Sequence, residues 1–201
     1  MEDWDWIFTP ELTDEKYYSP PYSIRPPSEL SAITGICKAP GTEYIPDGRV
    51  ELVFNNNNDT WYDILFHIIL RVVQPPGETT WPQERYHIFI NTISMKVQLR
   101  RYEDGSLETW SHDLYTDIWD QVDPLAWNWF RVTWWSVPGA GLIVRYEVKI
   151  GNTWYRLCDD FTGVTDMFTG EAYNRVGFGF KWGYADYGRP LIDNIRIYKA
   201  V

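Results

Sequence analysis

The sequence contains few of the side chains that carry redox or metal chemistry, with two cysteines and three histidines among 201 residues. Cys37 and Cys158 either form a disulfide or remain two buried thiols, and sequence reasoning leaves both open. The histidines, at positions 67, 87 and 112, lack the spacing of a metal site. Motifs of the P-loop, G-x-S-x-G and H-E-x-x-H types are absent. Enzymes that depend on those motifs are therefore excluded.

Basic residues are also scarce, with 18 Lys and Arg against 28 Asp and Glu and a net charge of −10. Nucleic-acid binding needs cations that neutralise phosphates, so DNA and RNA are excluded as partners. No apolar run has the length of a membrane-spanning helix, which excludes membrane insertion. The start MEDWDWIFTPELTDEK encodes no signal peptide. We expect a protein of an extracellular or virion surface that arrives by another route.

Aromatic residues, by contrast, are abundant: 12 Trp, 14 Tyr and 9 Phe. A core of this size cannot enclose every indole with its N–H group bonded, so we expect exposed aromatic platforms. Sugar-binding sites and protein interfaces both use such platforms.

Most of the chain is composed of short apolar segments separated by clusters of Gly, Pro, Asn and Asp, the pattern of β-strands and turns. Strands are predicted at 30–37, 48–55, 61–73, 85–91, 93–102, 129–136, 141–150, 153–158, 174–182 and 190–199. No helix longer than one or two turns is expected, and residues 106–128 are predicted to be a long loop. Residues 1–29 are predicted to be an extended, Pro-rich arm, and residues 30–201 a single domain.

Alternation with a period of two assigns faces to several strands. Along WYDILFHIILRVV, Asp63, His67 and Arg71 share the side opposite the apolar set. The core face of WFRVTWW is predicted to hold Phe130, Val132 and Trp134, and its outer face Trp129, Arg131, Thr133 and Trp135. In GLIVRYEVKI the core set is Leu142, Val144, Tyr146 and Val148, opposite Ile143, Arg145, Glu147 and Lys149. One-sided burial predicts an all-β, antiparallel two-sheet jelly-roll sandwich.

The order of these segments resembles that of a known superfamily. VDPLAWNWFRVTWW, GLIVRYEVKIGNTWYRL and RVGFGFKWGYADYGRPLIDNIRIY resemble the closing half of laminin-G-like and concanavalin A-like lectin/glucanase domains. SPPYSIRPPSEL resembles their opening strand, so the likeness spans roughly residues 19 to 201. It implies a concanavalin A-like jelly roll, a fold that hosts lectins, adhesion domains, viral surface domains and glycosidases.

Glycosidases of this superfamily carry an E-x-D-x-x-E strand, because hydrolysis needs paired carboxylates. The sequence has no such strand. Its nearest acidic clusters are Glu103, Asp104 and Glu108, and Asp159 with Asp160, which we expect to be solvated turn residues. His67 is expected to take part in salt pairing along its strand face. We therefore expect that this chain is not an enzyme.

Asp193 of PLIDNIRIY shares its predicted face with Ile195 and Ile197, and a carboxylate on an apolar face needs a partner. The resemblance implies a structural calcium ion there, to which Asp3, Asp5 and Gly48 could contribute ligands. The alternative is an aspartate that accepts hydrogen bonds from backbone N–H groups without a metal ion.

The outward set of two predicted strands forms the candidate ligand platform: Trp129, Arg131, Trp135, Arg145 and Glu147. Sugars stack on indoles, while Arg and Glu bind hydroxyl groups. In the alternative, another chain or the N-terminal arm covers this face. On another predicted strand, VGFGFKW, Gly177 and Gly179 leave a strip without side chains, where a ligand or a strand can approach closely. We predict a non-catalytic glycan-binding or adhesion module. The alternative is a capsid decoration or spike component that assembles as an oligomer or in a capsid and uses the same aromatics as a protein interface.

Overall fold

The computed structural model describes residues 4–6, 11–14, 18, 23–25, 32–37, 47–61, 64–72, 83–170, 173, 175–181 and 190–199. Within these ranges the regular structure is almost entirely β, with a single helix of four residues, α1 (Thr116–Trp119). This confirms the predicted all-β class. Among the helices of the described part of the chain, none is long and apolar enough to cross a membrane.

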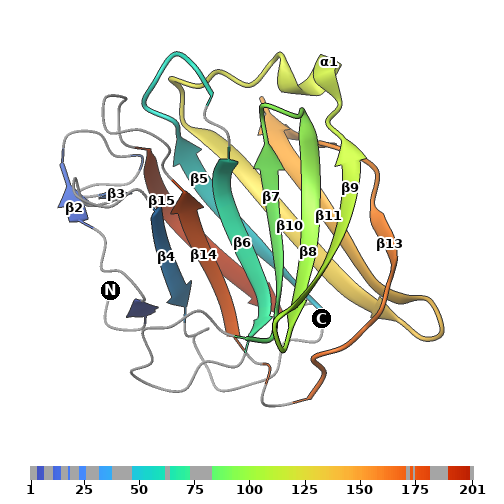
Figure 1. The fold of residues 1–201 in the computed structure, drawn as a ribbon. Coiled ribbons are helices and arrows are strands. Elements are labelled where there is room, and N and C mark those ends of the chain that lie inside the picture. Colours follow the sequence, from blue (N-terminus) through green and yellow to red (C-terminus); the bar gives the residue numbers. More distant parts are fainter. Residues whose placement is uncertain are drawn as a thin grey trace.

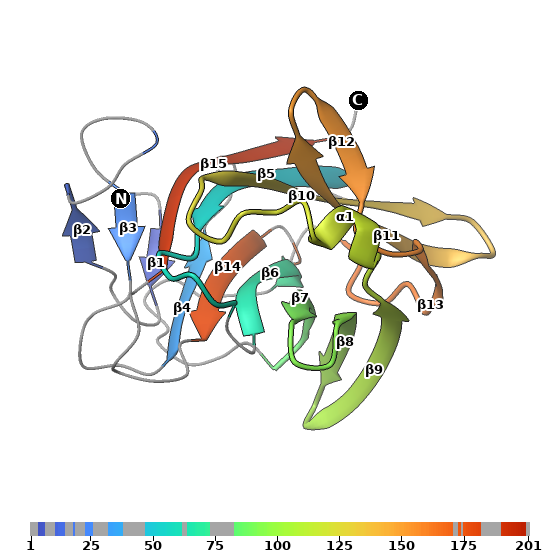
Figure 2. The same cartoon turned by 90° about the horizontal axis from the view of Figure 1, so that it is seen from above.

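The strands form two antiparallel sheets that face each other (Figures 1 and 2). Sheet A has the order β1-β4-β14-β6-β7-β8-β9. Its strands are β1 (Trp4–Trp6), β4 (Ala32–Cys37), β14 (Arg175–Lys181), β6 (Ile64–Val72), β7 (Arg85–Asn91), β8 (Lys96–Glu103) and β9 (Ser106–Asp113).

Sheet B has the order β12-β11-β10-β5-β15-β3-β2, with β13 paired to β11. Its strands are β12 (Thr153–Arg156), β11 (Gly141–Ile150), β10 (Asn128–Val137), β5 (Gly48–Asn55), β15 (Leu191–Lys199), β3 (Ser23–Arg25), β2 (Glu11–Thr13) and β13 (Phe161–Val164). Short strands of the N-terminal region thus pair with both sheets.

The core lies between the two sheets, and the alternation predicted for β10 and β11 is confirmed. The inward side chains are at most 1% exposed: Phe130, Val132, Trp134, Leu142, Val144, Tyr146 and Val148. Their outward neighbours on β10, from Trp129 to Trp135, are only partly buried. The two faces of sheet B therefore differ in chemistry as the pleat requires.

Two of the glycine-containing turns between strands form hairpins. Asp104 and Gly105, between β8 and β9, both have positive φ (45° and 83°), as in a type I′ turn. Gly141, which begins β11, has φ 86°, and a Cβ atom there would lie 2.2 Å from the carbonyl oxygen of Val164. A side chain at this position would therefore clash with the backbone.

The long loop predicted for residues 106–128 is wrong in its first third, because residues 106–113 form strand β9. Its side chains are mostly exposed, so the segment has no apolar stripe to reveal it. Backbone pairing with β8, from Lys96–Asp113 to Glu103–Ser106, forms the strand nonetheless. Strand β13 was also missed, because the burial of its four residues does not alternate with a period of two; its pairing with β11 is irregular as well.

The face predicted for Arg71 is also wrong. Arg71 has positive φ (50°), which breaks the alternation of β6. Its guanidinium is 1% exposed and donates to Asp166 and, at 2.7 Å, to Ser136 Oγ of β10 in the opposite sheet. Arg71 therefore bridges the sheets. Asp63, expected beside it, lies outside the described residues.

Candidate functional site

The outer face of sheet B carries a row of alternating charges. The pairing register places five side chains side by side across five strands. In the order β12, β11, β10, β5 and β15, this charged row consists of Arg156, Glu147, Arg131, Glu51 and Arg196. Opposite charges on neighbouring strands attract, so each member is flanked by residues that favour its ionised form.

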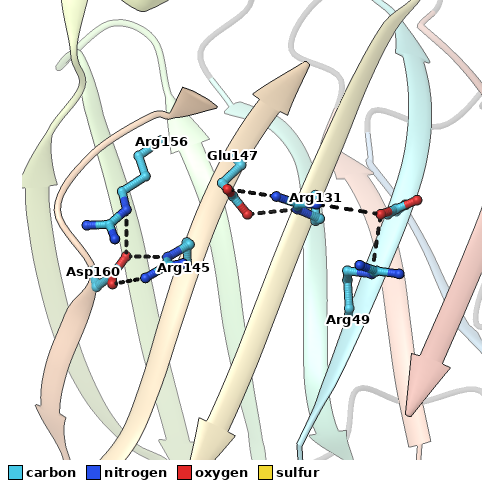
Figure 3. A network of polar contacts seen from close by, with 7 residues as sticks. Arg49, Arg131, Arg145, Glu147, Arg156 and Asp160 are labelled. Atoms are coloured by element: carbon cyan, nitrogen blue, oxygen red, sulfur yellow. Dashed lines mark hydrogen bonds and ion pairs between the residues drawn. The ribbon is translucent and has the colours of Figure 1, made fainter. Parts of the chain in front are cut away.

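Arg131 is the centre of the charged row (Figure 3). Its Nε and Nη2 donate to the two oxygens of Glu147 at 2.7 and 2.8 Å, a bidentate pair. On its other side, Nη1 lies 4.0 Å from Glu51 Oε1. Glu51 also receives an ion pair from Arg49 Nε at 3.3 Å. The side chains of Arg131, Glu147 and Glu51 are largely buried, so this geometry is well restrained.

A pocket opens beside the charged row, where the next transverse row contains a short side chain. Thr133 lies directly opposite Arg145 on one neighbouring strand and Arg49 on the other. Because threonine is much shorter than arginine, the space above it is empty, with a volume of about 500 Å³. The pocket is lined by Gly48, Arg49, Arg131, Thr133, Arg145, Glu147, Tyr198 and Lys199.

Asp160 holds two arginine side chains at the pocket. Arg145 donates Nε and Nη2 to the two oxygens of Asp160 at 2.9 and 2.7 Å, and this bonding raises the pKa of Arg145. Arg156 Nε lies 3.7 Å from Asp160 as well (Figure 3). Asp160, expected to be a solvated turn acid, is thus a structural partner of the pocket.

Aromatic rings support the same guanidiniums. Arg131 lies 4.2 Å from the ring centre of Trp154, Arg49 4.3 Å from that of Tyr198, and Arg145 5.2 Å from that of Trp135. Such cation–π contacts hold a guanidinium while leaving its edges available for hydrogen bonds. The tryptophan side chains that the structure describes are buried or half-buried. Tyr18, Tyr115 and Tyr155 are exposed, so the exposed aromatic side chains of this part of the chain are tyrosines and not indoles.

The five predicted ligand residues separate into two groups. Arg131, Arg145 and Glu147 line the pocket, whereas Trp129 and Trp135 do not. Trp135 supports Arg145. Trp129 donates from Nε1 to the hydroxyl of Tyr18 at 3.2 Å, so a residue of the N-terminal arm contacts it, as the alternative interpretation anticipated.

Sequence reasoning missed the other pocket residues, above all Arg49, Thr133 as the floor, and Tyr198. Thr133 was correctly placed on the outer face but has no functional group that attracts attention. Arg49 and Tyr198 belong to β5 and β15, far from β10 in the sequence. Only the pairing of those strands with each other and with β10 brings the residues together.

The predicted face of Asp193 is wrong, because β15 contains a bulge. The register shifts between Asp193 and Arg196, and Asn194 has φ 51°. Asp193 pairs with Val53 on the outer face, not with the core side of the strand. Its Oδ2 accepts the N–H of Tyr18 at 2.9 Å and its Oδ1 the N–H of Asn194 at 2.6 Å. These are backbone bonds of the kind that the metal-free alternative requires.

Gly48, one of the proposed calcium ligands, lies far from Asp193. Gly48 pairs with Lys199, at the other end of β15 from the Asp193–Val53 pair, which corresponds to about 17 Å along the strand. Asp5 belongs to β1 in sheet A, and Asp3 lies outside the described residues. No group of three His, Cys, Asp or Glu side chains that could hold a metal ion occurs in the described part of the chain.

A second polar feature lies on the outer face of sheet A, where His67 is bonded through Nδ1 to Nε2 of His87. Both rings are buried. Burial lowers the pKa of His87 well below its usual value, and His67 lowers it further. Gly177 pairs with Ile69 and Gly179 with His67, so the glycine strip borders this pair. For His67 the structure shows a His–His bond, whereas Arg71, one of its expected salt partners, pairs with Asp166.

The remaining candidates have structural partners. Glu103 and Glu108 contact the guanidinium of Arg101 at 3.6 and 2.9 Å. Asp159 accepts a hydrogen bond from the Tyr115 hydroxyl at 2.6 Å. Cys158 is a free, buried thiol, as in the second cysteine alternative. None of these arrangements pairs two carboxylates across an open cleft.

No protein-family model and no curated protein sequence matches the chain. Solved structures match it in fold. The VIP36 exoplasmic/lumenal domain in a Ca2+/Man-bound form has a TM-score of 0.58 at 16% identity, with 100% of this chain and 84% of that chain covered. Lectin II from Ulex europaeus gives 0.55 at 10% identity, covering 98% and 92%.

Carbohydrate binding module CBM66 from Bacillus subtilis gives a TM-score of 0.53 at 9% identity, covering 98% of this chain and 95% of the module. A GH43 protein, BlXynB from Bacillus licheniformis, gives 0.56 at 10% identity, but only 37% of that longer chain is covered. At these identities the likeness concerns the fold. It confirms the predicted concanavalin A-like jelly-roll fold.

Proposed function

We propose that this chain is a non-catalytic glycan-binding module and that the pocket above Thr133 receives the sugar. The observation that carries the proposal is the lining of this pocket. Its volume of about 500 Å³ suits one or two sugar rings. Guanidinium donors, the Glu147 carboxylate acceptor and the Tyr198 ring surround one space, and sugar hydroxyls need both donors and acceptors.

The structural neighbours support a sugar ligand. A carbohydrate binding module, a plant lectin and a domain solved in a Ca2+/Man-bound form share the fold over most of their lengths. None of these three is named as a capsid or spike protein. The alternative of a virion surface component has no comparable support.

The contacts of Glu147 and Glu51, the two carboxylates that flank Arg131, support binding without catalysis. Glycoside hydrolysis needs one carboxyl group that carries a proton and a second that acts as base or nucleophile. Both oxygens of Glu147 accept hydrogen bonds from Arg131, a group that has donors only. Glu51 is held between Arg49 and Arg131. Neither carboxylate is placed to deliver a proton to a sugar oxygen.

A glycan array followed by calorimetry tests the proposal. Thr133→Trp fills the pocket from its floor, and we expect it to weaken glycan binding at least tenfold while the melting temperature changes little. Thr109→Trp is the matched control, because Thr109 is an exposed residue of β9 in the other sheet. We expect this variant to bind as the wild type does.

The proposal fails if the wild-type protein binds no glycan, or if Thr133→Trp binds as tightly as Thr109→Trp. Sedimentation measurements on the same protein report its oligomeric state and so test the alternative of a structural surface component. A chain that assembles into a defined oligomer and binds no glycan would favour a surface component whose outer faces are protein interfaces.

A further inference from the structure

Positive charge is concentrated in the pocket of an acidic protein. Three arginines line it, namely Arg49, Arg131 and Arg145, and a fourth, Arg156, shares Asp160 with Arg145. Three carboxylates contact these arginines, namely Glu51, Glu147 and Asp160. Arginines therefore outnumber their carboxylate partners at this pocket, although the whole chain has a net charge of −10.

We infer that the ligand of this pocket is an acidic sugar with a single carboxylate, of the hexuronic acid type. The inference rests on the proposed glycan-binding function and names the class of glycan. A ligand carboxylate balances the one positive charge by which these four arginines exceed their three carboxylates, and a sugar ring of this class fits the available volume.

The hydrogen-bond donors that remain support this assignment. Arg131 and Arg145 each donate hydrogen bonds from Nε and Nη2 to one carboxylate. Nη1 of Arg145 takes part in none of the described hydrogen bonds. Nη1 of Arg131 is 4.0 Å from Glu51, which is beyond hydrogen-bond length. Both guanidiniums line the pocket with an edge whose donors can still bind an anion.

The surrounding charges favour one carboxylate over a highly sulfated chain. A polyanion would carry several further charges onto a protein whose net charge is −10, and charges repel within a screening length of about 8 to 10 Å. Glu147 in the wall would repel a second anionic group on the same ring but can accept hydrogen bonds from its hydroxyls. The pocket is therefore suited to one negative group among neutral ones.

Two variants reduce the charge without leaving a carboxylate alone. In Arg145→Gln, Asp160 retains its ion pair with Arg156. In Arg49→Gln, Glu51 keeps the more distant Arg131. The matched control is Arg196→Gln, which removes a cation from the outer face of the same sheet but from outside the pocket lining.

A third variant places a carboxylate in the pocket. Thr133 is the direct cross-strand neighbour of both Arg145 and Arg49, so the side chain of Thr133→Glu can reach the guanidiniums that the ligand would use. This variant adds attraction between strands, and we expect its melting temperature to match or exceed that of the wild type. A loss of binding then cannot be ascribed to unfolding.

The experiment is calorimetric titration with the methyl glycoside of galacturonic acid, which has one carboxylate, with the methyl ester of this sugar, and with a highly sulfated disaccharide. We expect the free acid to bind at least tenfold more tightly than the ester. Arg49→Gln, Arg145→Gln and Thr133→Glu should each remove most of this preference, whereas Arg196→Gln should preserve it.

The outcomes separate this inference from the proposed function. If the ester or a neutral glycan binds as tightly as the acid, and Thr133→Trp abolishes that binding, the function holds and the acidic ligand is wrong. Tighter binding of the sulfated disaccharide overturns the choice of a single carboxylate. If no saccharide binds, both conclusions fall.

Discussion

Trp134 and Trp135 are consecutive residues of β10 that lie on opposite faces of sheet B. Trp134 is 1% exposed and packs between the sheets. Trp135 is half-buried on the outer face, where the Arg145 guanidinium lies 5.2 Å from its ring centre. The two indoles therefore have different energetic roles despite their adjacency.

Replacing each tryptophan by alanine measures this difference. Trp134→Ala leaves a cavity in the core and should lower the free energy of unfolding by about 3 to 5 kcal/mol. Trp135→Ala removes one partly exposed cation–π contact and should cost about 1 kcal/mol or less. Urea denaturation of both variants provides the measurement. Equal losses would show that the assignment of faces in β10 is mistaken.

His87 should make the fold less stable in mildly acidic solution. Burial holds the pKa of this imidazole well below its usual value, whereas the unfolded chain takes up a proton near pH 6.5. The unfolded state therefore binds more protons below that pH. The stability is complete above about pH 7 and should fall by up to about 1.4 kcal/mol per pH unit below about 6.5.

Urea denaturation at several pH values between about 7.5 and 5.5 tests this dependence. His87→Gln retains a polar side chain without the titration, so its stability should change less over the same interval. Identical pH profiles for the wild type and this variant would contradict the assignment.

Cys158 should be unreactive in the native protein. The residue is 1% exposed, and burial raises the pKa of its thiol to about 12. Alkylating reagents attack the thiolate, which is scarce at pH 8 for such a thiol. We expect iodoacetamide to modify Cys158 only after urea unfolds the chain, as read by peptide mass mapping. Rapid native labelling of the peptide that contains Cys158 would refute this.

Removal of divalent cations should leave Asp193 and its surroundings intact. Backbone N–H groups of Tyr18 and Asn194 already bond both of its oxygens, so the carboxylate is satisfied without a cation. We expect the melting temperature to stay the same after chelation. In contrast, Asp193→Ala should lower it by a few degrees, and a decrease on chelation that this variant lacks would indicate a bound ion.

The parts of the structure that could be predicted depend on local information. Alternation within β10 and β11 reports which side chains face the core, because the pleat sets that pattern within a strand. It could not reveal β9, whose residues are mostly exposed on both faces. It also failed at Asp193, because a one-residue bulge at Asn194 reverses the alternation without any change in composition.

The candidate site was predictable only for residues on neighbouring strands of one hairpin. Arg131, Arg145 and Glu147 belong to β10 and β11, which are joined by a tight turn, so their proximity follows from the sequence. Arg49 and Tyr198 line the same pocket but belong to β5, far before β10 in the sequence, and to β15, far after β11. Their position depends on long-range strand pairing, which a periodic pattern does not encode.

The charged row also bears on how the strands find their correct alignment. Apolar alternation cannot distinguish the native pairing of β10 and β11 from one displaced by two residues, since both keep the same side chains in the core. A displacement of that size would set Arg131 opposite Arg145 or Lys149 in place of Glu147, as the native register shows. On the other side it would set Arg131 opposite Arg49 or Val53. Misaligned intermediates thus bring like charges together or forfeit an ion pair during folding, so the row acts as an error check on strand assembly.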